Sequence, residues 1–411
     1  MSKVKILIVS PGAQPEIPHM AIALEKKHID FLLLTTGILG RNLESRFFNA
    51  MSKYPKVALL LRKRQKDIGE RYIFRKFFFF EILIYISKGH LRSLMIEIRN
   101  WVLALYSRKV IRKYKPEILI AQGHCHFLTL KYASQQNVRT ILNTSIAHHE
   151  WLLNQMQMEA TKNPYWSRYL QHHKINRRIH RNLEREMRYA DRLICGSSFA
   201  ATTHIEHGVN SEKITVIPYG YNREVFYFEN LHDNTREHVL YIGQLTQRKG
   251  LGYLLEGFSQ SNLGNDIYLN IVGRDICNMR SEIERFSNVN YFESVDQIGL
   301  RKLMSFSKVL VLPTLGEGMC LSGLEAMASG VTILTSDFSG LDDYLISGYS
   351  GIVLEDISAQ QIASKLNYIY GKSFNNKLMA IRGHQAVRNL TWQNYHENFI
   401  KFIEKESKYL S

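Results

Sequence analysis

The 411-residue chain has few cysteines and no apolar run long enough to cross a bilayer. Its four cysteines lie far apart without a C-x-x-C pair, which excludes the dense disulfide framework of small secreted domains. The longest apolar run, residues 77–86, is interrupted by Glu81 and is much shorter than the roughly 20 residues of a membrane-spanning helix. Residues 1–12 are typical of a buried strand before a Pro-Gly turn, not of a signal peptide. We therefore expect a cytoplasmic protein.

Several nucleotide-binding and metal-binding motifs are also missing. The sequence has no G-x-x-x-x-G-K-[ST] and no G-x-G-x-x-G after a strand, which disfavours phosphate-loop hydrolases and dinucleotide oxidoreductases. It has no H-E-x-x-H, C-x-x-C or D-x-D either. Potential metal ligands do occur, at His124, His126, His148 and His149. Without those motifs, however, we expect neither a metal ion nor another cofactor.

Acidic residues are scarce in the first half of the chain. Overall, 53 Lys and Arg against 37 Asp and Glu give a net charge of +16. Residues 1–200 carry 34 basic and 14 acidic side chains, a net charge of +20, whereas residues 201–411 carry a net charge of −4. The densest basic stretch is 51–115, with 17 basic and 4 acidic residues. Such a field attracts the phosphates of nucleic acid or of anionic lipids.

Short apolar runs alternate with longer amphipathic stretches, which is typical of parallel sheets covered by helices on both faces. Because the chain is too long for one ordinary core, we expect an α/β protein with two doubly wound parallel-sheet domains facing across a cleft. The polar stretch 218–238 should join domains at 1–218 and 219–394, with a helix at about 395–411 returning to the first. Ligands should bind in the cleft, at the carboxyl ends of the strands. Strands are expected at 4–9, 31–35, 117–121, 140–143, 192–195, 215–217, 239–242, 268–272, 309–312 and 331–334.

Residues 313–330, PTLGEGMCLSGLEAMASG, follow a buried strand and enter a helix that begins near Cys320 or Leu321. The glycines let the backbone approach a ligand closely, and the free amides of a helix N-terminus suit a diphosphate. Carboxylates beside such an anion are costly unless they accept hydrogen bonds from sugar and ribose hydroxyls, a role open to Glu317 and Glu325. The alternative is that one is a loop charge and the other an exposed helix residue.

A second motif, HVLYIGQLTQRKG, covers residues 238–250. A buried strand ends at Gly243, and Arg248 and Lys249 open the next helix. This order puts two cations at the carboxyl end of a strand, where a diphosphate leaving group is best neutralised. The alternative is a solvated cationic turn.

Three segments, GQLTQRKG (243–250), IYLNIVGRD (267–275) and LPTLGEGMCLSGLEAMASGVTIL (312–334), resemble in order and spacing the nucleotide-sugar domain of family 4 retaining glycosyltransferases. That family has the two-domain GT-B fold. The segments DRLICGSS (191–198) and KITVIPYGYNREVF (213–226) resemble the end of its acceptor domain more loosely. The resemblance is specific over residues 185–360 and implies a nucleotide-sugar donor, UDP- or GDP-linked. The missing D-x-D, with which GT-A transferases hold a divalent ion, is consistent with a metal-independent reaction.

The resemblance also implies roles for individual residues. Glu317 matches the first acid of the family's E-x7-E pair, near the reacting sugar, and Glu325 matches the second, near the ribose. Lys249 matches the lysine that contacts the diphosphate, and Gln244 replaces its usual arginine partner, which leaves Arg248 as a helper. Further donor contacts are implied at Gly12, Gly243, Gly318, Met319, Cys320, Leu321 and Ser322. Of these, Cys320 replaces a family glycine and narrows the space near the sugar.

A catalytic histidine is also implied in the first domain, where TILNTSIAHHEW resembles a family strand that ends in one. We choose His148, with His149 as the second candidate. Such a histidine can hydrogen-bond the sugar without transferring a proton. On the acceptor side we expect His124 and His149, whereas His126 is more simply a polar residue at a strand end.

Cations flank an aromatic run within residues 62–112. This pattern fits helices that lie at a membrane surface, with rings at the acyl boundary and Lys and Arg on phosphates. The expected contacts are Arg75, Lys76, Phe77, Phe78, Phe79 and Phe80. One alternative is that residues 77–86 form a buried core helix. Nucleic acid is disfavoured, because consecutive Phe rings point around a helix and stack bases poorly.

We therefore predict a retaining hexosyltransferase that uses a nucleotide-diphosphate sugar at the inner face of the cell membrane. Its acceptor would be a lipid-linked saccharide in the synthesis of cell-envelope polysaccharide or lipopolysaccharide. Two alternatives remain: a sugar-nucleotide epimerase on the same fold, and an inactive membrane-associated scaffold. The sequence leaves open the sugar, the base, the acceptor, the linkage and the oligomeric state.

Overall fold

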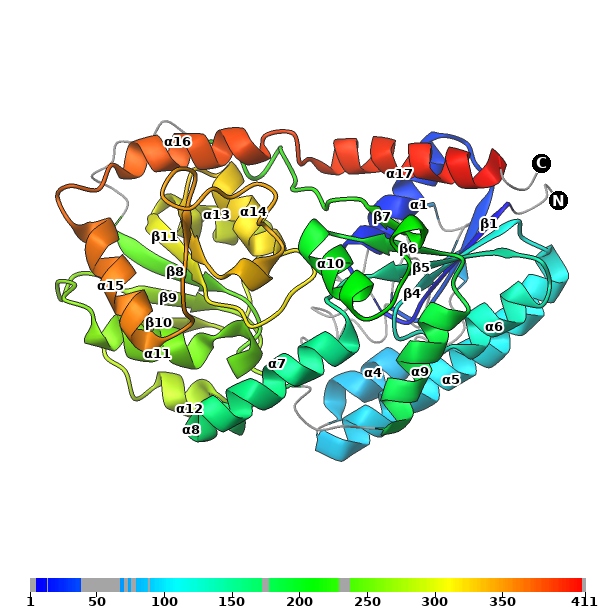
Figure 1. Ribbon diagram of the computed structural model, residues 1–411, viewed down its shortest axis with the longest axis horizontal. Coiled ribbons are helices and arrows are strands. Elements are labelled where there is room, and N and C mark those ends of the chain that lie inside the picture. The colour runs from blue at the N-terminus through cyan, green and yellow to red at the C-terminus, as the bar shows by residue number, and fades with distance from the viewer. Residues whose placement is uncertain are drawn as a thin grey trace, which may run out of the picture.

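The computed structural model describes residues 5–12, 14–37, 67–69, 73–74, 79–87, 89–171, 177–228 and 237–408. The chain forms two α/β domains side by side, each built on a parallel sheet (Figure 1). The first sheet has the order β3-β2-β1-β4-β5-β6-β7 and the second the order β10-β9-β8-β11-β12-β13. The predicted fold class, with two doubly wound sheets, is confirmed. The strands are β1 Ile6–Ser10, β2 Phe31–Thr35, β3 Ile73–Phe74, β4 Ile118–Gln122, β5 Arg139–Thr144, β6 Arg192–Cys195, β7 Ile214–Val216, β8 His238–Ile242, β9 Leu269–Val272, β10 Val289–Phe292, β11 Ser307–Leu312, β12 Thr332–Thr335 and β13 Ile352–Val353.

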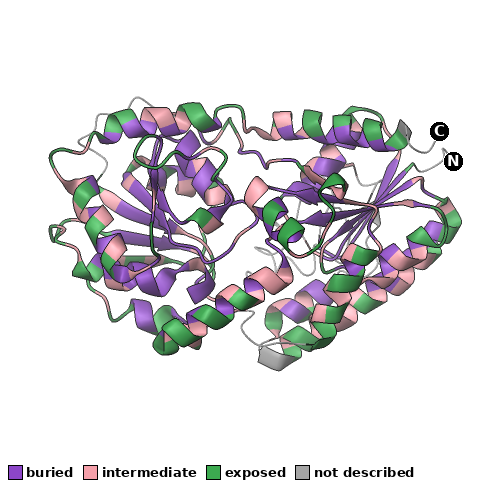
Figure 2. Ribbon diagram, viewed as in Figure 1, coloured by how far each residue is buried: buried purple, intermediate pink, exposed green. Residues whose placement is uncertain are grey.

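Helices surround both sheets, and exposed residues concentrate on their outer faces (Figure 2). Before the second sheet the chain forms α1 Glu16–Lys26, α4 Phe79–Ile86, α5 Gly89–Tyr114, α6 Leu128–Ser134, α7 His149–Lys162, α8 Pro164–Ser167, α9 Arg177–Arg188, α10 Ser198–Glu206 and the 3₁₀ turn η2 Ser211–Lys213. The remainder of the chain forms η4 Gln247–Lys249, α11 Leu251–Gln260, α12 Arg280–Ile283, α13 Gln297–Ser305, α14 Leu321–Ala328, η5 Asp337–Ser339, α15 Ala359–Tyr370, α16 Asn376–Val387 and α17 Trp392–Lys408.

The central strands are apolar at nearly every position because both faces of each sheet are covered. In β1, Ile6 and Ile8 pack in the cluster that contains Ile17 of α1. The alternate residues Leu7 and Val9 pack in a different cluster, together with helices α5 and α6. Successive strand side chains point to opposite faces, so this segregation follows from the period of two.

Three strands, β3, β10 and β13, were not predicted from the sequence. β3 and β10 are edge strands of their sheets and β13 is the opposite edge of the second sheet. Two of the three contain only two residues. The third, β10, alternates between intermediate and exposed residues, so it lacks the apolar run by which the central strands were found.

The chain crosses from the second domain back to the first between α16 and α17, and α17 packs against α1 of the first domain (Figure 1). Its buried Glu406 forms ion pairs with Arg139 at 2.9 Å and with Arg192 at 3.2 Å. These arginines begin β5 and β6, so the helix is anchored at the amino ends of two central strands. The cleft at their carboxyl ends is left open.

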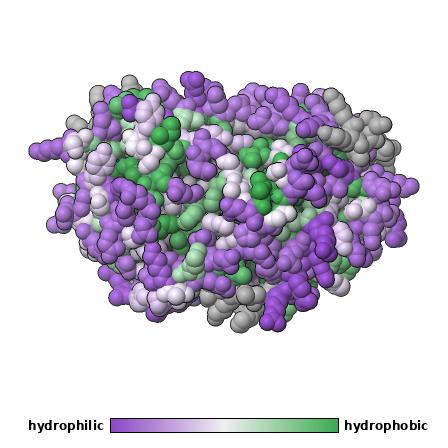
Figure 3. All heavy atoms as spheres, viewed as in Figure 1, coloured by the Kyte–Doolittle hydropathy of each residue, from purple (hydrophilic) through white to green (hydrophobic). Residues whose placement is uncertain are grey.

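No helix among the described residues is both long enough and apolar enough to span a bilayer. The face drawn in Figure 3 is mostly hydrophilic, with hydrophobic patches toward the middle. Of the predicted membrane contacts, Arg75, Lys76, Phe77 and Phe78 lie outside the described residues.

Candidate active site

A cavity of about 590 Å³ lies between the two domains and is lined by both. The first domain contributes segments that follow β1, β4 and β5, and the second contributes segments that follow β8 and β11. These are the carboxyl ends of central strands, as predicted. The walls include the predicted residues His124, His149, Gly243, Gln244, Arg248, Lys249, Glu317, Met319, Cys320, Leu321 and Ser322.

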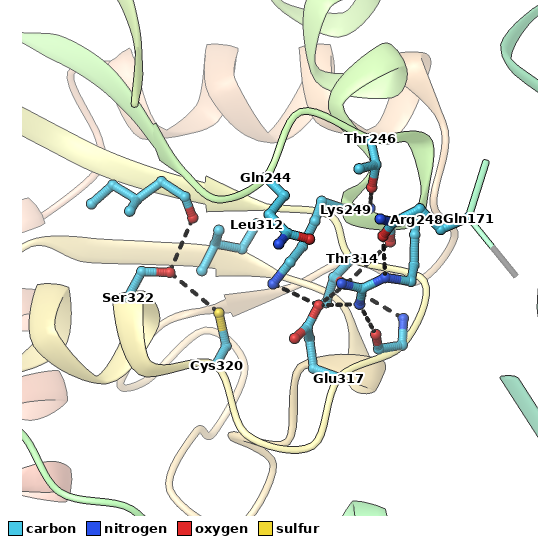
Figure 4. A network of polar contacts seen from close by, with 12 residues as sticks. Gln171, Gln244, Thr246, Arg248, Lys249, Leu312, Thr314, Glu317, Cys320 and Ser322 are labelled. Carbon is cyan, nitrogen blue, oxygen red and sulfur yellow. Dashed lines mark hydrogen bonds and ion pairs between the residues drawn. The ribbon is translucent and has the colours of Figure 1, made fainter. Parts of the chain in front are cut away.

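Glu317 lies at the centre of the polar network on the second-domain wall (Figure 4). Its Oε1 is 2.6 Å from Arg248 Nη1 and 2.6 Å from Lys249 Nζ. Thr314 Oγ1 donates a further hydrogen bond to the same oxygen at 3.3 Å. All three charged side chains are at most 13% exposed. The two cations hold the pKa of Glu317 at about 2, against the opposing effect of burial, so the carboxylate is ionised.

Arg248 is held by a backbone carbonyl and by a second side chain as well as by this carboxylate. Arg248 Nη1 donates to Gly316 O at 2.6 Å, and Arg248 Nε donates to Gln171 Oε1 at 3.2 Å. Gly250 follows with φ +71°, and a Cβ there would lie 1.9 Å from Pro313 O. The left-handed glycine thus allows η4 to turn into α11 directly beside the loop that carries Glu317.

The amino end of α14 forms the adjacent wall. Ser322 Oγ donates to Ile242 O at 3.1 Å and is 3.3 Å from Cys320 Sγ (Figure 4). A Cβ on Gly318 would lie 2.3 Å from Ser145 O of the first domain, so only glycine permits this close approach of the two domains. The helix begins at Leu321, as predicted. Its first turn and the two cations line the same cavity, at one edge of the second sheet.

Two family profiles match the chain in succession. The profile "Glycosyltransferase Family 4" matches residues 56–225, and "Glycosyl transferases group 1" matches residues 222–383. The chain belongs to glycosyltransferase family 4. This is a retaining family that transfers sugars from nucleotide donors.

Relatives and solved structures agree with this assignment. The lipopolysaccharide 1,2-N-acetylglucosaminetransferase of Salmonella typhimurium is 22% identical over 55% of this chain and 65% of its own length. The capsular polysaccharide glycosyltransferase CapM of Staphylococcus aureus is 24% identical over 48% of this chain and 57% of its own. These matches thus cover less than two thirds of each relative. The structure of Anabaena HepE with UDP and glucose has a TM-score of 0.66 at 13% identity, covers 98% of this chain and 100% of its own, and identifies the GT-B fold.

Glu325, the predicted second acid of the E-x7-E pair, is not among the residues that line the cavity. It lies one turn after Ser322, on the same face of α14. It remains partly accessible, and the surrounding protein raises its pKa to about 8 by desolvation. Gly12 and Gly318 are also absent from the walls, although Gln14, two residues after Gly12, and Met319, directly after Gly318, line the cavity.

The structure separates the two histidine candidates. His149 lines the cavity, whereas His148 does not and is only 3% exposed. His148 instead caps α7, because its Nδ1 accepts a hydrogen bond from Glu150 N at 3.3 Å. Burial and neighbouring histidines lower the pKa of His149 to about 3, so its ring is neutral. A neutral ring that faces the cavity suits the hydrogen-bonding role that was predicted for His148, with His149 as the second candidate.

Two cavity carboxyls, Glu16 and Glu186, were missed by the sequence reasoning. Glu16 begins α1 and accepts a hydrogen bond from Asn143 Nδ2 at 2.9 Å, and burial raises its pKa to about 7. Glu186 accepts hydrogen bonds from the backbone N–H groups of His124 and His126, at 2.9 and 2.8 Å, and burial raises its pKa to about 8. No local motif marks either acid, because the hydrogen-bond partners that hold each carboxyl in the cavity lie on or after a strand distant in sequence.

Glu186 also explains the unusual backbone near His124. His124 and His126 have φ of +69° and +79°, a conformation that side chains rarely adopt. The carboxyl group of Glu186 compensates, because each of its two oxygens accepts a hydrogen bond from one of the two amide groups. His124 faces the cavity as a result, and His126 does not line it.

Proposed function

We propose that the chain transfers a hexose-type sugar, with retention of configuration, from a UDP- or GDP-linked donor to a saccharide hydroxyl. The observation that carries the proposal is the pair of cations, buried Arg248 and largely enclosed Lys249, beside the amino end of α14. Such a group of donors matches a diphosphate, whose charge increases when the sugar leaves.

In this proposal the carboxylate of Glu317 and the donor diphosphate compete for the same cations. Without donor, Glu317 forms ion pairs with both of them at 2.6 Å, and one positive charge is left over. A bound diphosphate would take over Lys249 and the α14 amides, which releases Glu317 to accept hydrogen bonds from the sugar. Arg248 would stay partly with Gly316 O and so hold the loop.

The proposed reaction is a front-face displacement. The acceptor oxygen bonds to the anomeric carbon on the face from which the diphosphate departs, so the configuration is kept. The bond between the anomeric carbon and the donor's phosphate oxygen breaks, and this oxygen takes the proton of the acceptor hydroxyl. Lys249 and the amides near Leu321 stabilise the negative charge, while His149 hydrogen-bonds the sugar. No protein base is needed, which agrees with the ion-paired state of Glu317.

A donor screen tests this function directly. Purified protein is incubated with UDP-, GDP- and ADP-sugars in the presence of EDTA, and hydrolysis and transfer are followed by release of nucleotide. We expect one donor to be consumed without added metal, with the α-linked donor giving an α-linked product by NMR. An epimerised nucleotide sugar as the product would indicate the epimerase alternative. No consumption of any donor, together with no nucleotide binding by calorimetry, would refute the proposal.

Glu325 provides a pH-dependent prediction. Its pKa of about 8 lies above the ordinary range of a glutamate, so the group is mostly protonated at pH 7. Ribose hydroxyls that donate to the carboxylate favour the ionised form and lower this pKa. Nucleotide binding at pH 7 should therefore release up to about one proton, and the release should vanish near pH 9, where the group is already ionised.

Calorimetry of nucleotide binding in buffers with different ionisation enthalpies measures this release. The variant Glu325→Gln should bind more weakly and release correspondingly fewer protons. Equal proton release by the variant and the wild type would assign the titration to another group and would remove Glu325 from the ribose site.

We further propose a lipid-linked saccharide acceptor, used in envelope polysaccharide or lipopolysaccharide synthesis at the inner membrane face. The names of the Salmonella and Staphylococcus relatives support this context. So does an exposed apolar surface on the first domain. On α4, Phe79, Leu83 and Ile86 are 49%, 37% and 65% exposed, whereas Phe80 and Ile84 are buried. This helix is thus not wholly a core helix, and the packed neighbour α5 exposes Leu91, Leu94 and Trp101.

Substitution of the α4 surface should weaken binding to anionic vesicles. The triple variant Phe79→Ser, Leu83→Ser, Ile86→Ser removes apolar side chains from one helix face. We expect its partition onto phosphatidylglycerol vesicles, measured by flotation, to fall at least about tenfold. A matched control replaces Ile298 and Ile346, which are 77% and 64% exposed in the second domain. Wild-type binding that is insensitive to salt, or equal loss in the control, would contradict a membrane role for this surface.

A further inference from the structure

Four potential metal ligands meet between α7 and α9 beside the cavity. His149 and Glu150 begin α7, and His180 and Glu184 lie one turn apart on α9. One ligand atom from each residue can be chosen so that all four lie within 4.8 Å of one another. Tetrahedral Zn²⁺ sites place such atoms about 3.4 Å apart, so small side-chain movements suffice to enclose an ion.

The side-chain geometry favours a ligand over a purely internal network. His149 Nε2 is buried and has no hydrogen-bond partner among the residues that the structure describes. The rings of His149 and His180 are 4.4 Å apart and nearly perpendicular, at 72°. His180 is 3.5 Å from a Glu150 oxygen and 3.6 Å from a Glu184 oxygen, contacts that are long for hydrogen bonds. Glu184 is 51% exposed, so an ion can reach the group from solvent.

A second group, His148, Glu150 and His207, is less suitable. His148 Nδ1 accepts a hydrogen bond from Glu150 N, so the neutral ring carries its proton on Nε2 and has no lone pair there for a metal. This group also offers three ligands, against four in the first. The first group combines two imidazoles with two carboxylates, a ligand set suited to Zn²⁺ and related transition metals.

We propose that His149, Glu150, His180 and Glu184 bind one transition-metal ion of the Zn²⁺ class. The ion would tie the start of α7 to α9, two segments that the chain itself joins only through a long connection. Its role differs from that of the donor site, whose cations are Arg248 and Lys249. Because His149 also lines the cavity, metal loading should withdraw this ring from the sugar and slow transfer; this last consequence rests on the proposed function.

Metal binding can be measured without any donor. Protein stripped with EDTA and exchanged into chelator-free buffer is titrated with ZnCl₂ by calorimetry, and its thermal midpoint is recorded with and without the ion. We expect a site that binds one Zn²⁺ per chain and raises the midpoint. His180→Ala and Glu184→Gln, neither of which lines the cavity, should each lower the affinity at least about tenfold.

Two controls remove an imidazole elsewhere. His28→Asn replaces an exposed histidine whose φ of +54° asparagine tolerates, and His207→Ala removes a ligand of the second group only. Both should keep wild-type affinity. No Zn²⁺ binding by the wild type, unchanged affinity of His180→Ala, or loss in His207→Ala would each overturn the proposal.

If transfer is observed, Zn²⁺ should inhibit the wild type but not His180→Ala. Without metal, this variant should be as active as the wild type. Inhibition that persists in this variant would contradict the link between the ion and His149. If no donor is used at all, the proposed function fails, and the calorimetric comparison still decides the metal site.

Discussion

Replacing Glu317 with glutamine is expected to lower kcat by about 10² to 10³-fold while nucleotide affinity is kept or increased. Glutamine has the same size but no charge, so it orients the sugar poorly. It also no longer competes with the diphosphate for Arg248 and Lys249. Single-turnover transfer and calorimetric nucleotide binding measure the two effects separately. Loss of nucleotide binding together with activity would contradict the role proposed for this carboxylate.

The same variant should be less stable without nucleotide. Its two cations are 8% and 13% exposed, and removal of the partner of a buried charge costs about 3 kcal/mol. The pKa of Glu317 is depressed to about 2, so its ion pairs stabilise the fold above the ordinary Glu pKa and are lost as the pH falls toward 2. The stability difference should therefore be constant near neutral pH and shrink below about pH 4.

Denaturant unfolding across this pH range checks the effect on stability, and nucleotide should restore part of the loss because it binds only the folded state. Glu355→Gln is the matched control. Glu355 is 76% exposed and pairs with Lys365 at 3.3 Å, and a surface pair of this kind contributes little. An equal change in both variants would indicate a general charge effect.

Replacing Lys249 with alanine is expected to lower kcat by about 10² to 10³-fold, because the leaving diphosphate loses its point charge. Nucleotide affinity should fall by a smaller factor, about tenfold, since Arg248 and the α14 amides remain. Lys249→Arg should recover part of the rate, because a positive charge returns to nearly the same place. The exposed pair again supplies a control, in Lys365→Ala.

Arg248→Ala distinguishes the two cations. Arg248 donates to Gly316 O and to Gln171 Oε1, so its removal also frees the loop that carries Glu317. We expect Arg248→Ala to lower both stability and activity, and Lys249→Ala to lower mainly activity. Lys249→Ala with nearly wild-type kcat would assign neutralisation of the leaving group to Arg248 and the helix amides instead.

Sequence patterns were most informative where a function depends on neighbours along the chain. The GQLTQRKG turn and the loop around Glu317 each follow a buried strand, so their residues reach the carboxyl edge of the sheet wherever the strands pair. The start of α14 at Leu321 was predicted for the same reason. Edge strands such as β10 were missed, because their alternating exposure carries little apolar signal.

The histidines show where local pattern ends. His148 and His149 are adjacent, and sequence alone favoured His148. The start of α7 decides between them, since the cap position turns His148 to its own helix and His149 to the cavity. The placement of Glu186 under the His124 backbone, and of His180 beside His149, likewise depends on how α9 packs.

By itself, the sequence of this chain determined two parallel-sheet domains, the places of Glu317 and the two cations at strand ends, and the unequal distribution of charge. These properties follow from strand periodicity, turn chemistry and composition, which act over a few residues. Only the tertiary structure decided that Glu317 pairs with both Arg248 and Lys249, which histidine faces the cavity, and which buried carboxyls line it. Those features depend on contacts between segments far apart in sequence, and a pKa shift or a shared ligand site exists only once packing has removed water and brought the groups together.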